Sequence, residues 1–145
     1  MNTDNSNTKT QPITVEATIN APVEKVWAMW SEPKHITQWC QASDDWHAPY
    51  ADNDLTTGGK FKTTMAAKDG SFSFDFEGVY SNVKHLEVIE YNMPDGRHVS
   101  IKFSKEGNST KVVETFDPET QNPIEMQRGG WQAILDNFKK HVETN

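Results

Sequence analysis

Cysteine is almost missing from this chain, since Cys40 is the only one among 145 residues. A single cysteine excludes an internal disulfide framework and is typical of proteins in a reducing compartment. The sequence also has no run of roughly 20 apolar residues, the length that a membrane-spanning helix requires. Residues 1–11 are rich in asparagine and threonine and lack the apolar centre of a secretory signal peptide. We therefore expect a cytoplasmic protein without membrane insertion.

Positive charge is scarce. The chain has 14 lysine and arginine residues against 21 aspartate and glutamate residues, which gives a formal net charge of -7. Nucleic-acid binding requires Lys and Arg side chains that neutralise phosphates, and attachment to an anionic membrane requires a basic cluster. The sequence has no run of basic residues. Neither nucleic acid nor a membrane surface is therefore expected as a partner.

The familiar catalytic and metal-binding motifs are missing as well. The chain has no GxSxG nucleophile elbow, no phosphate-binding GxxxxGK and no dinucleotide-binding GxGxxG. Its five histidines are far apart and form no HxxxH pattern, and a lone cysteine forms no CxxC. The sequence therefore predicts no catalytic residue, no metal site and no cofactor.

Large aromatic side chains are plentiful. Hydrophobic residues make up only 34% of the chain, but they include five Trp, seven Phe and three Tyr. Each ring buries a large apolar area, so a few of them can form the core of an ordered protein. A chain of this length is expected to fold as one domain, over residues 12–145, after a flexible tail at 1–11.

Hydrophobic periodicity predicts the order of the elements. A two-residue alternation predicts a strand at 13–19, and further strands are predicted at 60–65, 71–80, 86–91, 98–103 and 110–116. Two short helices are expected between the first two strands, broken by Pro33. Residues 41–57 read as a polar, irregular segment. Apolar residues at helical spacing predict a long amphipathic helix at the C-terminus.

This order favours an α+β fold with a curved, six-stranded antiparallel sheet. Two short helices follow the first strand, and the long C-terminal helix packs across the sheet. Because all the helices can cover only one face of the sheet, the space beneath the long helix is the expected place for a pocket.

Several short segments carry a resemblance to a known family. In their order, they resemble the SRPBCC (START-like) superfamily, which has the helix-grip fold. They are most similar to single-domain bacterial relatives of the C-terminal domain of the heat-shock protein 90 ATPase activator. The resemblance covers about residues 12–143. The segments are Ile19 to Trp27, Trp39 to Trp46, Gly58 to Phe61, Asp69-Gly70, Gly78 to Tyr80, Gly130-Trp131 and Ile134-Leu135.

The resemblance implies a hydrophobic cavity between the sheet and the long helix, because family members bind lipids, polyketides and flavonoid-like aromatics. The expected function is a monomeric binding or carrier protein for a small hydrophobic molecule. Two alternatives stay open. One is a cyclase-type enzyme on the same scaffold, using polar groups such as His47, His98 and Glu114. The other is a co-chaperone-like module that contacts a chaperone through its surface.

The candidate cavity residues are mostly large and apolar, and each could equally be ordinary core. Gly130 is included because it follows Gly129 inside the predicted long helix, where glycine is unfavourable unless space is needed. The full set is Trp39, Trp46, Phe61, Met65, Phe74, Phe76, Met93, His98, Glu114, Met126, Gly130, Trp131 and Ile134.

Overall fold

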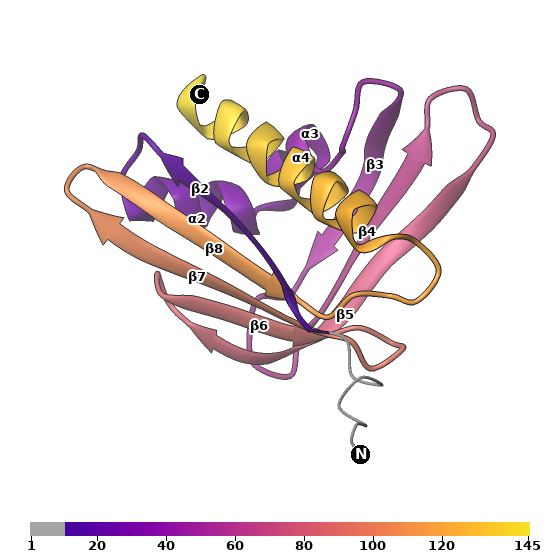
Figure 1. Cartoon of the computed structure of the whole chain (residues 1–145). Helices are drawn as coiled ribbons and strands as arrows, with labels where there is room; N and C mark the ends of the chain where they lie inside the picture. Colours follow the sequence, from indigo (N-terminus) through magenta and orange to yellow (C-terminus); the bar gives the residue numbers. More distant parts are fainter. Residues whose placement is uncertain (1–10) are drawn as a thin grey trace, which may run out of the picture.

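The computed structural model describes residues 11–145, so residues 1–10 of the predicted tail lie outside the described part. The first strand, β2 (Ile13–Ile19), leads into the helices α2 (Val23–Ser31) and α3 (Pro33–Trp39). The strands β3 (Trp46–Asn53), β4 (Lys60–Ala67), β5 (Ser73–Lys84), β6 (Val88–Asn92), β7 (His98–Glu106) and β8 (Ser109–Phe116) follow. The long helix α4 (Ile124–Glu143) ends the chain (Figure 1).

The strands form one antiparallel sheet in the order β2-β8-β7-β6-β5-β4-β3. The sheet curls into a half-barrel, and α4 lies across its hollow side together with α2 and α3 (Figure 1). The predicted fold class, with a long C-terminal helix across a curved sheet, is therefore confirmed. In the described part of the chain, no helix is both long and apolar enough to cross a membrane.

The sheet has seven strands, so the predicted count of six is wrong. The additional strand is β3, within the segment that was expected to be irregular. β3 lies at the edge of the sheet, Ala48 is its only fully buried residue, and its alternation of more and less buried residues changes phase midway. It also contains Pro49 and a register shift between His47 and Tyr50. Proline and bulges are features of edge strands, and they conceal a strand from a search for periodicity.

β8 shows how the pleat of the sheet places side chains inside the half-barrel. Thr110, Val112, Glu114 and Phe116 are buried, and the residues between them are half-buried. Successive side chains of a strand point to opposite faces, so these four share the hollow side of the sheet. Glu114 is thus held on the inner face by the same pattern that buries its apolar neighbours.

The two halves of α4 have different surroundings. In the C-terminal half, Leu135, Phe138 and Val142 are fully buried and close the hydrophobic core. In the N-terminal half, Gln127 is the only buried residue, and Met126 is 63% exposed. The core therefore fills the space beneath one end of the helix and leaves room beneath the other.

Candidate functional site

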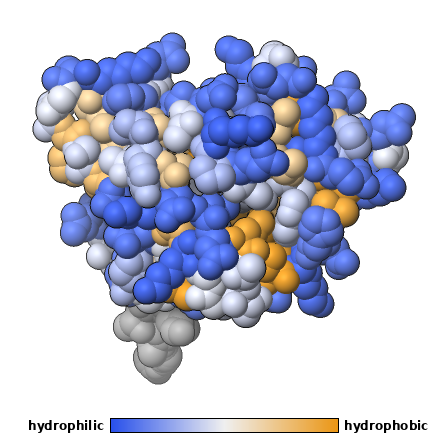
Figure 2. All heavy atoms as spheres, turned by 180° about the vertical axis from the view of Figure 1, so that it is seen from behind, coloured by the Kyte–Doolittle hydropathy of each residue, from blue (hydrophilic) through white to orange (hydrophobic). Residues whose placement is uncertain are grey.

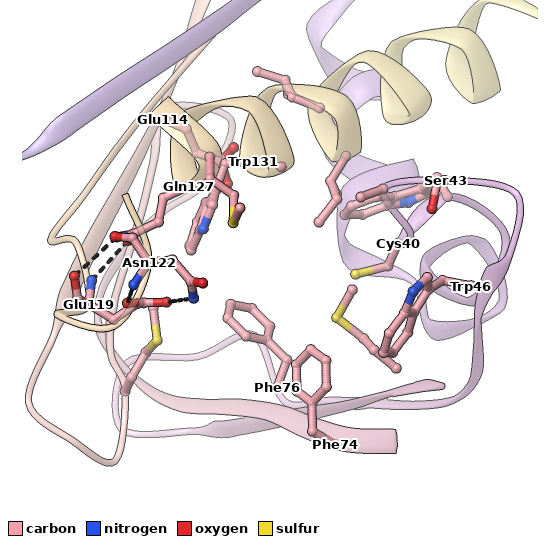
Figure 3. A pocket seen from close by; sticks show the side chains of 18 of the residues that line it. Cys40, Ser43, Trp46, Phe74, Phe76, Glu114, Glu119, Asn122, Gln127 and Trp131 are labelled. Atoms are coloured by element: carbon pink, nitrogen blue, oxygen red, sulfur yellow. Dashed lines mark hydrogen bonds between the residues drawn. The ribbon is translucent and has the colours of Figure 1, made fainter. Parts of the chain in front are cut away.

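A pocket of about 480 Å³ lies between the N-terminal half of α4 and the sheet. Figure 3 shows Phe74 and Phe76 rising from β5 on one side and Trp131 reaching down from α4 on the other. Small-molecule sites in proteins usually have volumes of about 300–1,000 Å³. The volume of the pocket lies within this range, and the pocket opens to the surface.

A row of rings along β5 and the residue before it passes from core to surface, and its middle members, Phe74 and Phe76, form the floor of the pocket. Tyr80 is buried and Phe76 half-buried, whereas Phe74 is 42% and Phe72 59% exposed. Trp46 of the edge strand packs edge-on against Phe72 and Phe74, with ring centroids 6.1 and 6.0 Å away. These exposed rings form an apolar rim, and an apolar molecule entering the pocket would contact the rim first.

The roof of the pocket is one face of α4. The indole of Trp131 stacks on Phe116 and also meets Phe76 edge-on, with centroids 6.0 Å apart. Gly130 precedes it and also lines the pocket. Within the described residues, a Cβ atom at Gly130 would have no heavy atom within 4 Å outside its own helix backbone and chain neighbours. The glycine therefore borders open space rather than a close neighbour.

Glu114 is the polar side chain that is most deeply buried in the pocket wall. It is 6% exposed, and its neighbours in the adjacent strands are Val15 and Ile101. Its carboxyl group has no hydrogen-bond partner within residues 11–145. Burial raises the pKa of Glu114 from 4.5 to about 8, because no nearby donor offsets the loss of water.

Two ionisable groups on other elements also face this carboxyl group. Burial, and secondly the charge of Glu114, raise the pKa of the Cys40 thiol to about 12. The same two causes, in the same order, raise the pKa of Tyr91 well above its ordinary value of 10. Both groups are therefore neutral over the pH range in which Glu114 titrates.

The remaining polar groups at one end of the pocket are bonded to one another (Figure 3). The side-chain amide of Gln127 donates to the carbonyl oxygens of Glu119 and Asn122 over 3.0 and 2.8 Å. Its oxygen accepts from the backbone N–H of Glu119 over 2.9 Å. Hydrogen bonds from Asn122 and Gln121 outweigh a small desolvation effect and lower the pKa of Glu119. This network holds the loop before α4 and leaves these groups less available to a ligand than Glu114.

All the candidate residues line this pocket except Phe61 and His98. Phe61 packs against Tyr91 and Phe76 and lines a separate cavity of about 50 Å³. His98 alternates with the buried Val99, so its ring lies on the other face of the sheet, 3.0 Å from the side-chain oxygen of Asn92. The expectation that these two residues line the main cavity is therefore wrong.

Of the three polar residues considered for an enzyme, only Glu114 faces the pocket. His98 is on the outer face, and His47 is exposed on β3 and does not line the pocket. Within the described residues, no group of three or more His, Cys, Asp or Glu side chains is placed to hold a metal ion.

Sequence reasoning missed several lining residues. Tyr91 could have been found, because it alternates with the apolar Ile89 in a predicted strand. Leu135 directly follows the candidate Ile134 in the pattern of the long helix. The lining residues in the loops between α3 and β3 and between β8 and α4 have no periodicity that signals their position. The missed set is Trp30, Cys40, Ala42, Ser43, Tyr91, Arg97, Glu119, Asn122, Gln127 and Leu135.

Comparison with known proteins places this arrangement in a family. The model of the family described as Activator of Hsp90 ATPase homolog 1-like protein matches residues 20–143. A search of the curated proteins found no match to this chain.

Solved structures share both sequence and fold with the chain. The AHSA1-like protein from Aeromonas hydrophila is 45% identical, with 92% of each chain covered and a TM-score of 0.86. A protein from Cytophaga hutchinsonii is 59% identical, with 92% of this chain and 93% of that chain covered and a TM-score of 0.80. A protein from Chromobacterium violaceum is 19% identical and covers 94% of this chain and 100% of its own, with a TM-score of 0.83. The last of these shows the fold alone.

Proposed function

The chain belongs to the family described as Activator of Hsp90 ATPase homolog 1-like protein, and from that premise we propose that it binds or carries a small, mainly apolar molecule in the pocket beneath α4. The observation that carries the proposal is the pocket itself, with about 480 Å³ of open space and a mainly apolar lining that includes seven aromatic side chains. Protein interiors are otherwise packed as densely as organic crystals, with few voids larger than a water molecule. A space of this size is suited to a ligand.

The lining indicates the class of ligand. Phe74 and Phe76 form the floor, and Trp131 lies opposite them in the roof. Transfer of apolar surface from water is worth about 25 cal/mol for each Å² buried, and aromatic rings prefer edge-on or offset contacts with other rings. Lipid-like, polyketide-like or flavonoid-like molecules fit this lining. The back of the molecule is mostly hydrophilic, with some apolar patches between its polar side chains (Figure 2).

Binding accounts for the site better than catalysis does. A pocket enzyme requires two or more polar groups that converge on the substrate. Among the residues expected for that role, only Glu114 reaches the pocket. The raised pKa values keep the nearby Cys40 thiol and Tyr91 phenol neutral, and Glu119 and Gln127 are engaged in the loop network. The exposed apolar side chains Phe74 and Met126 line the pocket itself. The pocket explains the exposure of these two, whereas Tyr50, Phe72 and Val79 are exposed outside its lining.

Indole N–H signals in a two-dimensional NMR spectrum test the proposal, with 2-ethylnaphthalene, a flavonoid and a fatty acid as probes. We expect a saturable shift of the Trp46 and Trp131 signals, because both side chains line the pocket. Trp27 is the internal control, since it packs on His85 and Phe103 and does not line the pocket. If no probe moves the Trp46 or Trp131 signal, or if Trp27 moves equally, the proposal is wrong.

A further inference from the structure

The buried carboxyl group in the wall of the apolar pocket suggests which apolar molecules bind. We propose that Glu114 selects neutral ligands that carry one hydrogen-bonding oxygen, a carbonyl or a hydroxyl, on an otherwise apolar skeleton. This inference rests on the proposed function, and it adds a polar anchor to a pocket whose lining is mainly apolar.

The geometry gives Glu114 an unmet hydrogen-bonding capacity. Its side chain is 6% exposed and lines the pocket, and within residues 11–145 it has no hydrogen-bond partner. Val15 and Ile101 flank it in the sheet, so no neighbouring strand supplies a donor or acceptor. Gln41 Oε1 is the one fully buried polar side-chain atom without a partner among the described residues, so the Glu114 carboxyl group still reaches the pocket space. A ligand oxygen in the pocket can bond to it in place of water, whereas a purely apolar ligand would leave it without a partner.

A neutral ligand suits this environment better than a cationic amine. Burial raises the pKa of Glu114 to about 8, so the carboxyl group is mostly protonated near neutral pH. A protonated carboxyl group donates through its O–H and accepts through its carbonyl oxygen, so it can pair with either a carbonyl or a hydroxyl. An amine would require an ion pair in the same apolar wall, where removing both charges from water is expensive.

The ionisable groups around Glu114 leave it as the group that titrates near pH 8. Cys40 after α3 and Tyr91 on β6 both have raised pKa values and remain neutral there. Arg97 lines the pocket and is paired with Asp95 at 2.7 Å, and Glu119 has a lowered pKa and remains charged. The pocket-lining residues of α4 carry no ionisable side chain, and the flanking residue on β2 is Val15. A change of ligand preference near pH 8 therefore reports on Glu114.

A matched set of probes tests the selection by calorimetry or fluorescence titration. The set is 2-acetylnaphthalene, with a carbonyl oxygen, the apolar 2-ethylnaphthalene, and the cationic 2-(aminomethyl)naphthalene. In a purely apolar pocket the ethyl probe binds most tightly, because it is the least soluble in water. Near pH 6 we expect the acetyl probe to bind at least about fivefold more tightly than the ethyl probe.

Two substitutions at the anchor separate its hydrogen bond from its charge. Glu114→Gln keeps a donor and an acceptor but cannot ionise, so it should retain the preference for the acetyl probe at every pH. Glu114→Leu offers neither, so the ethyl probe should bind more tightly than the acetyl probe. In the native protein the acetyl preference should disappear as pH rises through about 8. Glu90→Gln is the matched control, because Glu90 bonds to Ser100 and does not line the pocket.

The possible outcomes distinguish this inference from the proposed function. If the ethyl probe binds but the acetyl probe has no advantage, or if Glu114→Gln and Glu114→Leu behave alike, the selection by Glu114 is wrong and the apolar pocket stands. If the amine binds most tightly and Glu114→Gln removes that advantage, the site is an ion-pair site and the inference is also wrong. If no probe binds, the proposed function fails and this inference fails with it.

Discussion

The indole ring of Trp131 lies flat on the phenyl ring of Phe116, with ring centroids 3.9 Å apart and planes inclined by 10°. This contact joins the roof of the pocket to the sheet, since Trp131 belongs to α4 and Phe116 to β8. Phe116 is two residues from Glu114 on the same face of β8. The stacked pair therefore fixes α4 beside the buried carboxyl group.

Loss of this stack should weaken the fold by a measurable coupling. Aromatic pairs contribute about 0.5–1.5 kcal/mol beyond the area they bury. We expect a double-mutant cycle of Trp131→Leu and Phe116→Leu, measured by urea unfolding, to give a coupling energy of about that size. A coupling energy near zero would show that the two rings contribute independently and that the stack does not hold α4 in place.

The buried carboxyl group of Glu114 should make the protein less stable at alkaline pH. Its native pKa of about 8 is above the ordinary value of 4.5, so the folded protein holds this proton more tightly than the unfolded chain does. The resulting stability is complete below about pH 4.5 and is lost as pH rises through about 8, with an upper limit on the order of 5 kcal/mol. Urea unfolding of Glu114→Gln should show a smaller loss of unfolding free energy over this pH range. Parallel curves for the native protein and the variant would contradict the prediction.

The contact between His35 and His141 should make the protein less stable at acidic pH, which is the opposite of the effect of Glu114. Nδ1 of His35 lies 2.9 Å from Nε2 of His141, so a hydrogen bond here requires at least one neutral ring. Burial, and then the charge of His35, lower the pKa of His141 below 6.5. The native state therefore binds fewer protons than the unfolded chain, and stability falls as pH drops through that range.

A His141→Gln variant isolates this effect. We expect the native protein to lose more unfolding free energy than His141→Gln between about pH 7.5 and pH 5.5, as measured by urea unfolding. Glu114 contributes almost equally to both proteins, so the difference between the curves belongs to the histidine pair. Glu32, whose carboxylate lies 3.9 Å from His35, is also present in both. A constant difference across this range would show that the pair does not titrate on unfolding.

The strands and helices with a regular hydrophobic period could be predicted from the sequence. Features that depend on contacts between residues distant in the sequence could not. The inner face of β8 follows from a two-residue period, and this period places Glu114 inside. β3 was missed because this edge strand fully buries only Ala48 and its alternation is interrupted by the bulge between His47 and Tyr50. His98 was misplaced although its alternation with Val99, Ile101 and Phe103 already indicated the face opposite the core. The contact between His35 and His141 joins residues that are distant in sequence and could not be predicted from periodicity.

The two helix glycines provide a last test, because their surroundings differ while their backbone is alike. A Cβ atom at either would meet no heavy atom within 4 Å beyond its own helix backbone and chain neighbours, as far as the described residues go, but only Gly130 lines the pocket. Alanine at either position should raise the free energy of unfolding by about 0.5–1 kcal/mol, because glycine is a poor helix former. Gly130→Leu should keep the fold and weaken binding of 2-ethylnaphthalene about tenfold or more, since its side chain occupies ligand space. Gly129→Ala is the control and should bind normally. A loss of more than about 3 kcal/mol in Gly130→Leu, with unchanged binding, would place Gly130 in packed core.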